Sequence, residues 1–283
     1  MKKRYPAVTI IRKLDVGEVP RTPTKQWFNL SLTKPRKILL EAASFYGFPI
    51  SFTQEQNGAL IQNVHPIQST ETKQISSSSK VELSLHTETA FHQYKPTMVL
   101  LLCLRGDSKA VTTYADVNEI IEHLSPETLT TLTQPLFTTS VDESFRTKGE
   151  SDMEITCSIL KRYKEIPSFV VDPPIYEICY DEALMKGLNE QATNALGELK
   201  QAIDKSIREI VLETGDLLIM NNTRVIHGRL PFKARYDGTD RWLLRMFVIN
   251  QLPPKNHSVQ TIDEQYPSIV SAVVDFVPLT AIK

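Results

Sequence analysis

Short strand-like segments recur along this chain, and their number constrains the possible folds more than any other feature. Val81–His86 alternates apolar and polar residues with a period of two, as a half-buried strand does. Many strands, few helices and glycine-marked turns predict a mainly β fold with flanking helices, a sandwich or a barrel. The other predicted strands are Met98–Leu104, Ala110–Tyr114, Phe137–Val141, Glu154–Leu160, Ile175–Tyr180, Ile210–Leu212, Leu217–Met220 and Arg241–Ile249.

Four segments predict helices. Pro35 precedes a run of good helix formers that ends near Gly47, and Asp116–Leu124 is a second candidate. Ser125 and the proline after it form the N-cap and N1 pattern that opens a helix. Leu188–Ile207 is the strongest amphipathic candidate, because its apolar residues fall roughly on one stripe.

The stretch Gln62–Lys80 is polar and contains four consecutive serines at 76–79. It predicts a long loop, either a lid over a binding site or an ordinary surface loop. The sequence shows no internal repeat and no clear interior linker. We therefore expect a single domain over 1–283, with a core at about 81–250, an N-terminal elaboration at 1–80 and a C-terminal extension at 251–283.

The charge balance indicates a small-molecule partner. Lys and Arg number 32 against 33 for Asp and Glu, so no basic excess favours nucleic acid or an anionic membrane. The longest apolar run, Met98–Leu104, is too short to cross a bilayer, and no signal-peptide pattern follows the basic start. Three widely spaced cysteines without a CxxC pair predict a reducing cytoplasm. The oligomeric state is left open.

His86 and Glu88 lie two residues apart in a predicted strand, so their side chains can reach one metal ion. His227, which follows another predicted strand, is the candidate third ligand. Two histidines and one carboxylate on one face of an ion leave the opposite face free, as in non-haem iron(II) oxygenases. A histidine and a glutamate two apart are more often a surface pair, so the spacing alone is a weak signal.

Arg241 and Arg245 strengthen the metal hypothesis. On a strand they share a face with Leu243, and buried guanidinium groups need anionic partners. The guanidinium fork matches carboxylate geometry, so the pair predicts a site for two carboxylates. Internal salt bridges to Asp or Glu are the alternative for either arginine alone.

Three segments resemble one known family: HTETAFH from His86, GDLLIMNNTRVIHGR ending at Arg229, and RWLLR from Arg241. In this order and spacing they are similar to the clavaminate synthase-like branch of the TauD/TfdA oxygenases, which includes amino-acid hydroxylases. The resemblance covers roughly 81–250. It implies a double-stranded β-helix core (jelly roll, cupin-like) and a dioxygenase that uses Fe(II), 2-oxoglutarate and O2. Such an enzyme hydroxylates a small carboxylate substrate, here a free L-amino acid, and releases succinate and CO2.

The resemblance also assigns residues. It makes His86, Glu88 and His227 the catalytic iron ligands, and it pairs Arg241 with the distal carboxylate of 2-oxoglutarate. Thr112 is the best match for the threonine that joins this arginine, although Thr113 is adjacent and strand alternation lets only one face inward. Arg245 would hold the α-carboxylate of the substrate, and Asp181 would help to bind that substrate; otherwise Asp181 is simply a cap. The arginine-specific pattern has an acidic residue where this chain has Cys179, which argues against arginine as substrate.

Other interpretations stay open. A non-catalytic metal-binding sensor could keep the triad but would not need Arg241 and Arg245, and a zinc hydrolase would need a general base that the sequence does not identify. With Glu88 present, the resemblance implies hydroxylation or desaturation and not halogenation. His92 is either a second-layer residue of the site or, more commonly for such a histidine, a packing residue.

Overall fold

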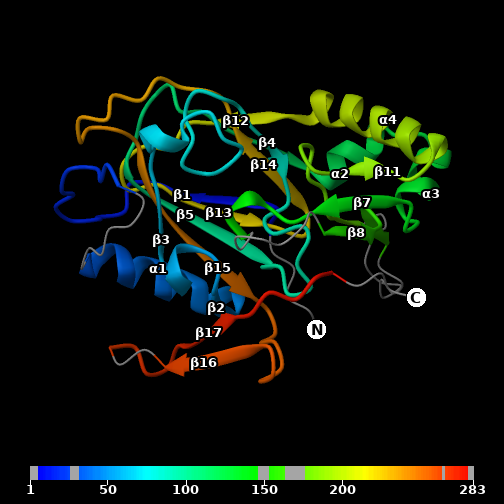
Figure 1. Ribbon diagram of the computed structural model, residues 1–283. Helices are drawn as coiled ribbons and strands as arrows, with labels where there is room; N and C mark the ends of the chain where they lie inside the picture. Colours follow the sequence, from blue (N-terminus) through cyan, green and yellow to red (C-terminus); the bar gives the residue numbers. More distant parts are fainter. Residues whose placement is uncertain (1–5, 26–31, 146–152, 163–175, 263–264, 280–283) are drawn as a thin grey trace.

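The structure of the protein is a computed structural model that describes residues 6–25, 32–145, 153–162, 176–262 and 265–279. Two β-sheets face each other within these residues (Figure 1). The larger has the strand order β1-β13-β5-β15-β2-β17-β16, and β3 also pairs with β15. Its strands are β1 (Val8–Ile11), β2 (Phe48–Phe52), β3 (Gln62–Val64), β5 (Met98–Arg105), β13 (Leu217–Asn221), β15 (Trp242–Ile249), β16 (Ser258–Ile262) and β17 (Val270–Val274).

The smaller sheet has the order β12-β6-β14-β4 and carries two of the predicted metal ligands. Its strands are β4 (Leu83–His86), β6 (Thr112–Asp116), β12 (Arg208–Ile210) and β14 (Val225–Arg229). Two small sheets lie beside it, one formed by β7 (Phe137–Ser140), β8 (Glu154–Cys157) and β11 (Lys186–Gly187), the other by β9 (Leu160–Arg162) and β10 (Tyr176–Ile178).

The helices cover the outer faces of the two sheets (Figure 1). The α-helices are α1 (Thr33–Tyr46), α2 (Val117–Ile120), α3 (Pro126–Leu132) and α4 (Glu190–Ser206), and the short 3-10 turns are η1 (Gln56–Gly58), η2 (Gln68–Thr70), η3 (Ile121–His123) and η4 (Glu143–Phe145). Helix α1 packs on the larger sheet, whereas α2, α3 and α4 share a hydrophobic core with the outer face of the smaller sheet.

Alternation along β15 explains why its sequence is almost continuously apolar. Trp242 and Leu244 point outward into the core under α1, while Leu243 and Phe247 point inward into the core between the sheets. Both faces of this strand are therefore buried, which explains why every residue of β15 except Arg245 is apolar. Arg245 shares the inward face, as predicted from the spacing.

Most predicted elements are confirmed with small shifts of their ends. The predicted strand at 154–160 is divided into β8 and β9, and the one at 210–212 lies earlier, at β12. Leu188 and Ile207 lie outside α4 and are exposed, so they are not part of its buried stripe. The basic start (1–5) and Ile175 lie outside the described residues.

The prediction of one long loop over Gln62–Lys80 is wrong at its start and correct for most of the rest, which is irregular apart from one 3-10 turn and brings Gln74, Ile75 and Ser76 to the wall of a cavity. This stretch contains β3 and η2, and β3 pairs with β15 in the register Leu243↔Val64 and Arg245↔Gln62. The polar residues Gln62 and Asn63 break the alternation of apolar and polar residues by which a strand is predicted from sequence. Their side chains accept hydrogen bonds from Arg245 and Trp242 inside the protein. The division of the chain into one domain with its elaborations stays a prediction.

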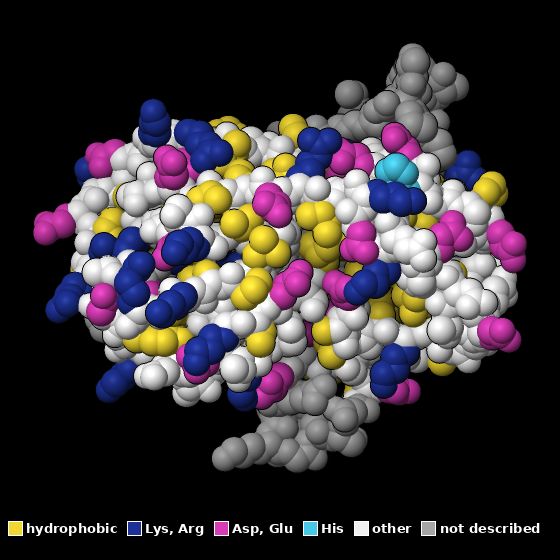
Figure 2. Space-filling view, turned by 90° about the horizontal axis from the view of Figure 1, so that it is seen from above, with side chains coloured by type: hydrophobic (Ala, Val, Ile, Leu, Met, Phe, Trp, Pro, Cys, Tyr) yellow, Lys and Arg dark blue, Asp and Glu magenta, His cyan; other side chains and the backbone are white. Residues whose placement is uncertain are grey.

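The surface carries both signs of charge. Figure 2 shows basic and acidic side chains interspersed on the face seen from above, with no continuous basic patch there. No helix among the described residues is both long and apolar enough to cross a membrane.

Candidate metal centre

His86, Glu88 and His227 converge on one point between the sheets. Each offers a ligand atom, and these atoms all lie within 4.8 Å of one another. The two histidines face each other because β4 and β14 are paired in the register His227↔His86. Their ring centroids are 4.6 Å apart. The structure thus brings together the three residues that the sequence predicted as metal ligands.

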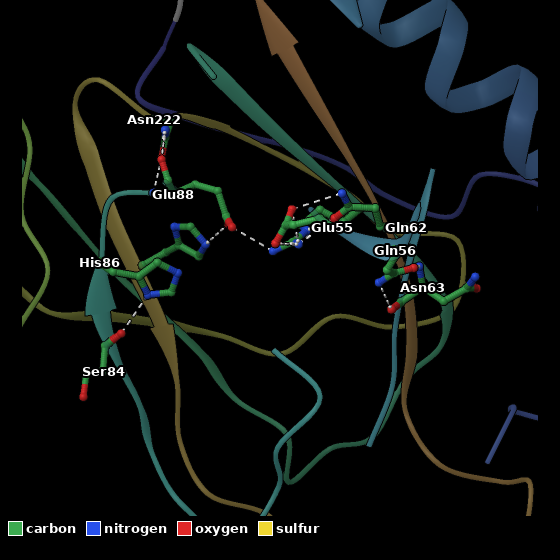
Figure 3. A network of polar contacts seen from close by, with 10 residues as sticks. Glu55, Gln56, Gln62, Asn63, Ser84, His86, Glu88 and Asn222 are labelled. Carbon is green, nitrogen blue, oxygen red and sulfur yellow. Dashed lines mark hydrogen bonds and ion pairs between the residues drawn. The ribbon is translucent and has the colours of Figure 1, made fainter. Parts of the chain in front are cut away.

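Glu88 reaches this point from a turn and not from a strand. Strand β4 ends at His86, and Thr89 has a left-handed φ of 50°. Asn222 fixes the turn from both sides: its side-chain oxygen accepts from the Glu88 amide at 2.8 Å, and its Nδ2 donates to the Glu88 carbonyl at 3.2 Å (Figure 3). The expected geometry of an extended strand is therefore not the one observed, although the carboxylate ends at the same place.

The donor set fits a divalent cation. Oε2 of Glu88 is buried without a hydrogen-bond partner among the described residues and lies 3.5 Å from Nε2 of His227. Nδ1 of His86 donates to the Ser84 carbonyl at 2.8 Å, which leaves Nε2 as the ligand atom. Burial lowers the pKa of His227, so its imidazole stays neutral as a metal ligand must. Burial alone raises the pKa of Glu88, but Arg245, His227 and His86 lower it to about 2.

The triad lines one wall of a cavity of about 320 Å³, at the small end of the range for small-ligand pockets. Both predicted arginines and Thr112 line the same cavity, as does Asp181. Other lining residues come from both sheets and the connections around them, and they include Val64, Gln74, Ile75, Ser76, Leu101, Asp142, Leu184, Gly228, Arg229 and Leu243.

Arg241 stands at one end of this cavity with most of its donors unused. It is 7% exposed, and its one hydrogen bond among the described residues runs from Nη2 to Oγ1 of Thr112 at 3.2 Å. No carboxylate lies within salt-bridge distance of it in the part of the chain that the structure describes. Burial lowers its pKa to about 10, so it remains charged. Thr113, the other threonine considered, has a buried hydroxyl without a partner among the described residues.

Arg245 stands at the other end and has partners on three sides, Glu55, Gln62 and Glu88, which are labelled in Figure 3. It donates to Oε1 of Glu88 at 2.8 Å, to both carboxylate oxygens of Glu55 at 3.2 Å and to the amide oxygen of Gln62 from Nε at 2.8 Å. Among the described residues, Arg245 therefore forms the internal salt bridge that the sequence left open as an alternative, and Arg241 does not.

Asp142 and Asp181 add negative charge near His86. Oδ1 of Asp181 accepts from the amides of Ala183 at 2.9 Å and Leu184 at 3.0 Å, so this residue caps a turn and also lines the cavity. Burial raises the pKa of Asp181. Burial, followed by repulsion from Asp181, raises the pKa of Asp142 to about 7.

Sequence reasoning missed Glu55, Gln62 and Asp142. Glu55 and Gln62 belong to a region that offered no motif. The pairing of β3 with β15 brings Gln62 to Arg245, and Glu55 follows β2, which pairs with the other end of β15. Asp142 follows the predicted strand at 137–141, and an acidic residue at the end of a strand was the available signal. His92 is a packing residue: it lies against Phe52 with ring centroids 4.8 Å apart and bonds to the backbone near the C-terminus.

The comparisons with known proteins agree with this geometry. Residues 39–247 match the family described as "Taurine catabolism dioxygenase TauD, TfdA family". The chain is 36% identical to L-asparagine oxygenase from Streptomyces coelicolor, over 86% of this chain and 71% of that protein. It is 32% identical to L-lysine 3-hydroxylase from Catenulispora acidiphila, over 83% of this chain and 64% of that protein.

Solved structures show the same arrangement of elements. Asparagine oxygenase in complex with Fe(II), 2S,3S-3-hydroxyasparagine and succinate superposes with a TM-score of 0.76, at 32% identity, over 86% of this chain and 74% of that one. The non-haem iron oxygenase OrfP with Fe and alpha-ketoglutaric acid gives a TM-score of 0.75, at 30% identity, over 87% and 76% of the two chains. The fold is accordingly a jelly roll, and the chain belongs to the TauD/TfdA family of iron(II)- and 2-oxoglutarate-dependent oxygenases.

Proposed function

We propose that this enzyme hydroxylates a free L-amino acid whose side chain is rich in hydrogen-bond donors, a basic or an amide side chain. His86, Glu88 and His227 hold the iron. Arg241 with Thr112 receives the distal carboxylate of 2-oxoglutarate, and Arg245 receives the α-carboxylate of the amino acid. When bound, iron supplies the activation of dioxygen that couples oxidation of 2-oxoglutarate to oxidation of the substrate.

The observation that carries this proposal is the uneven charge along one cavity. At the Arg241 end a buried cation has no acidic partner among the described residues, which suits an incoming carboxylate. At the opposite end Arg245 already donates to Glu55 and Glu88, while Asp142 and Asp181 line the cavity without a cationic partner among the described residues. A ligand there must bring positive charge or donors, as the amine and side chain of such an amino acid do.

The names of the relatives support the same substrate class. One is named L-asparagine oxygenase, one L-lysine 3-hydroxylase and one L-ornithine/L-arginine 3-hydroxylase. Asparagine carries an amide, and the others carry cationic groups. Asp181 and Asp142 can accept hydrogen bonds from either kind of side chain.

The test begins with an anaerobic titration of the enzyme with iron(II) and 2-oxoglutarate. A visible metal-to-ligand charge-transfer band is expected at saturation, and its absence contradicts the proposal. Succinate formation is then measured across a panel of L-amino acids, with the product mass read for each. We expect asparagine, glutamine, lysine or ornithine to give a product 16 mass units heavier, and aspartate and glutamate to be the poorest substrates. Arginine is expected to react poorly, because Cys179 stands where the arginine-specific pattern has an acidic residue.

His227→Ala is the matched negative control for this assay. It should abolish iron-dependent turnover, because two remaining ligands do not hold the ion in place. The fold should persist, since His227 contributes a side chain to the cavity and its backbone pairing in β14 is unchanged. Turnover by a folded His227→Ala enzyme contradicts the assignment of this ligand.

We also infer that the enzyme works in a reducing compartment, the cytoplasm. Cys103, Cys157 and Cys179 are all free thiols, and two of them are buried. Detection of the protein in the soluble cytoplasmic fraction of its own cells supports this inference, and its recovery only from an oxidising compartment contradicts it.

A further inference from the structure

Arg245 is held by three groups besides Glu88. Its Nε donates to Gln62, its Nη2 donates to Glu55, and the guanidinium carbon lies 4.5 Å from the ring centroid of Phe247. Gln62 in turn donates from Nε2 to Oε2 of Glu55 at 3.1 Å. This closed set of bonds leaves the guanidinium little freedom to rotate away from its remaining partner.

That remaining partner is Glu88, a metal ligand. Nη1 of Arg245 donates to Oε1 of Glu88 at 2.8 Å. The other carboxylate oxygen, Oε2, has no hydrogen-bond partner among the described residues and faces Nε2 of His227. The two oxygens of one carboxylate therefore have separate tasks, one toward the arginine and one toward the metal position.

We propose that Arg245 is a positioning residue that restricts Glu88 to a single metal-ligating oxygen. The inference rests on the proposed function, because the site must keep three positions free: two for 2-oxoglutarate and one for dioxygen. A carboxylate that binds with both oxygens takes one of these positions. An arginine that occupies Oε1 prevents this, and a cation beside Oε1 also repels a metal that approaches it.

The role is compatible with binding of the substrate by the same arginine. Nη1 carries two N–H groups, and one of them bonds to Glu88. The second has no acceptor among the described residues and is available to a substrate carboxylate. If Arg245 served the substrate alone, its removal would change nothing in the absence of an amino acid.

The experiment therefore omits the amino acid and uses Mn(II) as the probe. Water proton relaxation reports how many exchangeable waters the bound ion carries. We expect three in the wild-type protein and two in Arg245→Met, so that the relaxation enhancement per bound ion falls by about one third. Mn(II) affinity should be kept or increased, because Glu88 gains a second contact, while 2-oxoglutarate should bind at least about tenfold more weakly because one position is lost.

Glu55→Gln is the matched control, because it removes a charge beside Arg245 and leaves the contact with Glu88. It should keep the wild-type relaxation enhancement. Equal enhancement in wild type and Arg245→Met overturns the inference, and so does a loss of water in Glu55→Gln. If Arg245→Met does not fold, the double variant Arg245→Met with Glu55→Gln removes the cation together with one of its acids and is read in the same way.

Failure of the proposed function gives a different result. In the wild-type protein, 2-oxoglutarate should displace two of the three waters from Mn(II). If it displaces none, the cavity does not take 2-oxoglutarate at the metal. Arg245 can still restrict Glu88 in that case, and the comparison of wild type with Arg245→Met decides this independently.

Discussion

The two ends of the cavity use the same residue type in opposite ways. Arg241 is buried beside a threonine hydroxyl and no acid among the described residues, whereas Arg245 is bonded to Glu55, Glu88 and Gln62. Both arginines project from one face of the β15 segment. The difference shows that a shared face gives two side chains a common cavity, and that the neighbouring strands decide whether each cation is already neutralised.

This contrast separates a cation that serves a ligand from one that serves the protein. A buried charge without a partner costs stability until a ligand arrives, while a buried charge with partners destabilises the fold when it is removed. Stability measurements on the metal-free protein should therefore give changes of opposite sign at the two positions.

The largest change is expected for Arg245→Met in the presence of a chelator. This substitution leaves Glu55 and Glu88 buried without their cation, and it should lower the free energy of unfolding by about 3 to 5 kcal/mol. Urea denaturation measures this change. Addition of Mn(II) should restore part of it, because the metal neutralises Glu88. A change in the free energy of unfolding below about 1 kcal/mol would mean that Glu55 and Glu88 do not depend on Arg245 for their neutralisation, and the contrast with Arg241 would be lost.

Arg241→Met should act in the opposite direction. Without 2-oxoglutarate it should raise the free energy of unfolding by about 1 to 3 kcal/mol, because the buried cation has no acid to lose. In the same variant the affinity for 2-oxoglutarate should fall by about a hundredfold, as expected for loss of a bidentate pair of charged hydrogen bonds. Arg241→Lys keeps the charge without the fork and should lie between the two. If Arg241→Met instead lowered the free energy of unfolding without 2-oxoglutarate, Arg241 could not be a buried cation that lacks an acidic partner.

The acidic end should show a pH dependence that the Arg241 end lacks. Asp142 has a pKa raised to about 7 in the folded metal-free protein from its usual 3.8. Between these values the folded state binds more protons than the unfolded state, so the stability contributed by this group falls as pH rises from about 4 to about 7. Because the side chain keeps some contact with water, we expect a total of about 1 to 2 kcal/mol.

Asp142→Asn tests this dependence directly. The difference in unfolding free energy between the variant and the wild type should grow in favour of the variant up to about pH 7 and then level off. Urea denaturation across the pH range with a chelator measures it. A difference that is constant with pH means that Asp142 is not shifted.

The smallest effect concerns the hydroxyl beside Arg241. Thr112→Val removes one hydrogen bond to the guanidinium and should weaken 2-oxoglutarate binding by about 1 kcal/mol, or about fivefold. Thr113→Val is the matched control, because its hydroxyl is buried without a partner among the described residues. It should leave 2-oxoglutarate affinity unchanged, and an equal effect at both positions would remove Thr112 from the co-substrate site.

The sequence brought out the cluster of His86, Glu88 and His227 because each of these proposed ligands is marked by its near neighbours. His86 and Glu88 are separated by one residue, and His227 is followed at a set distance by Arg241 and Arg245. The three side chains converge even though Glu88 lies in a turn, since a turn and a strand can both direct a side chain to the same point. Periodicity also identified the long apolar strands, which are buried on both faces.

The partners of Arg245 could not be predicted in this way. Glu55 and Gln62 lie far from Arg245 in the chain, and they approach it only because β3 pairs with one end of β15 while β2 pairs with the other. No local pattern encodes that pairing. The surplus of acid at this end depends on the same long-range contacts, and so does any inference about the substrate.

The parallel pairing of β17 with β2 has a consequence for how the chain reaches its native state. Ala272 lies opposite Ile50, and Val274 lies opposite Phe52, across a very large separation in sequence. Closing so long a loop is slow, and contacts of this kind favour slow folding. During synthesis one edge of β2 stays without its neighbour until residues 270–274 have emerged, which leaves a strand edge open to wrong pairing. Expression yield should therefore respond strongly to temperature and to chaperones that shield strand edges, whatever the state of the active site.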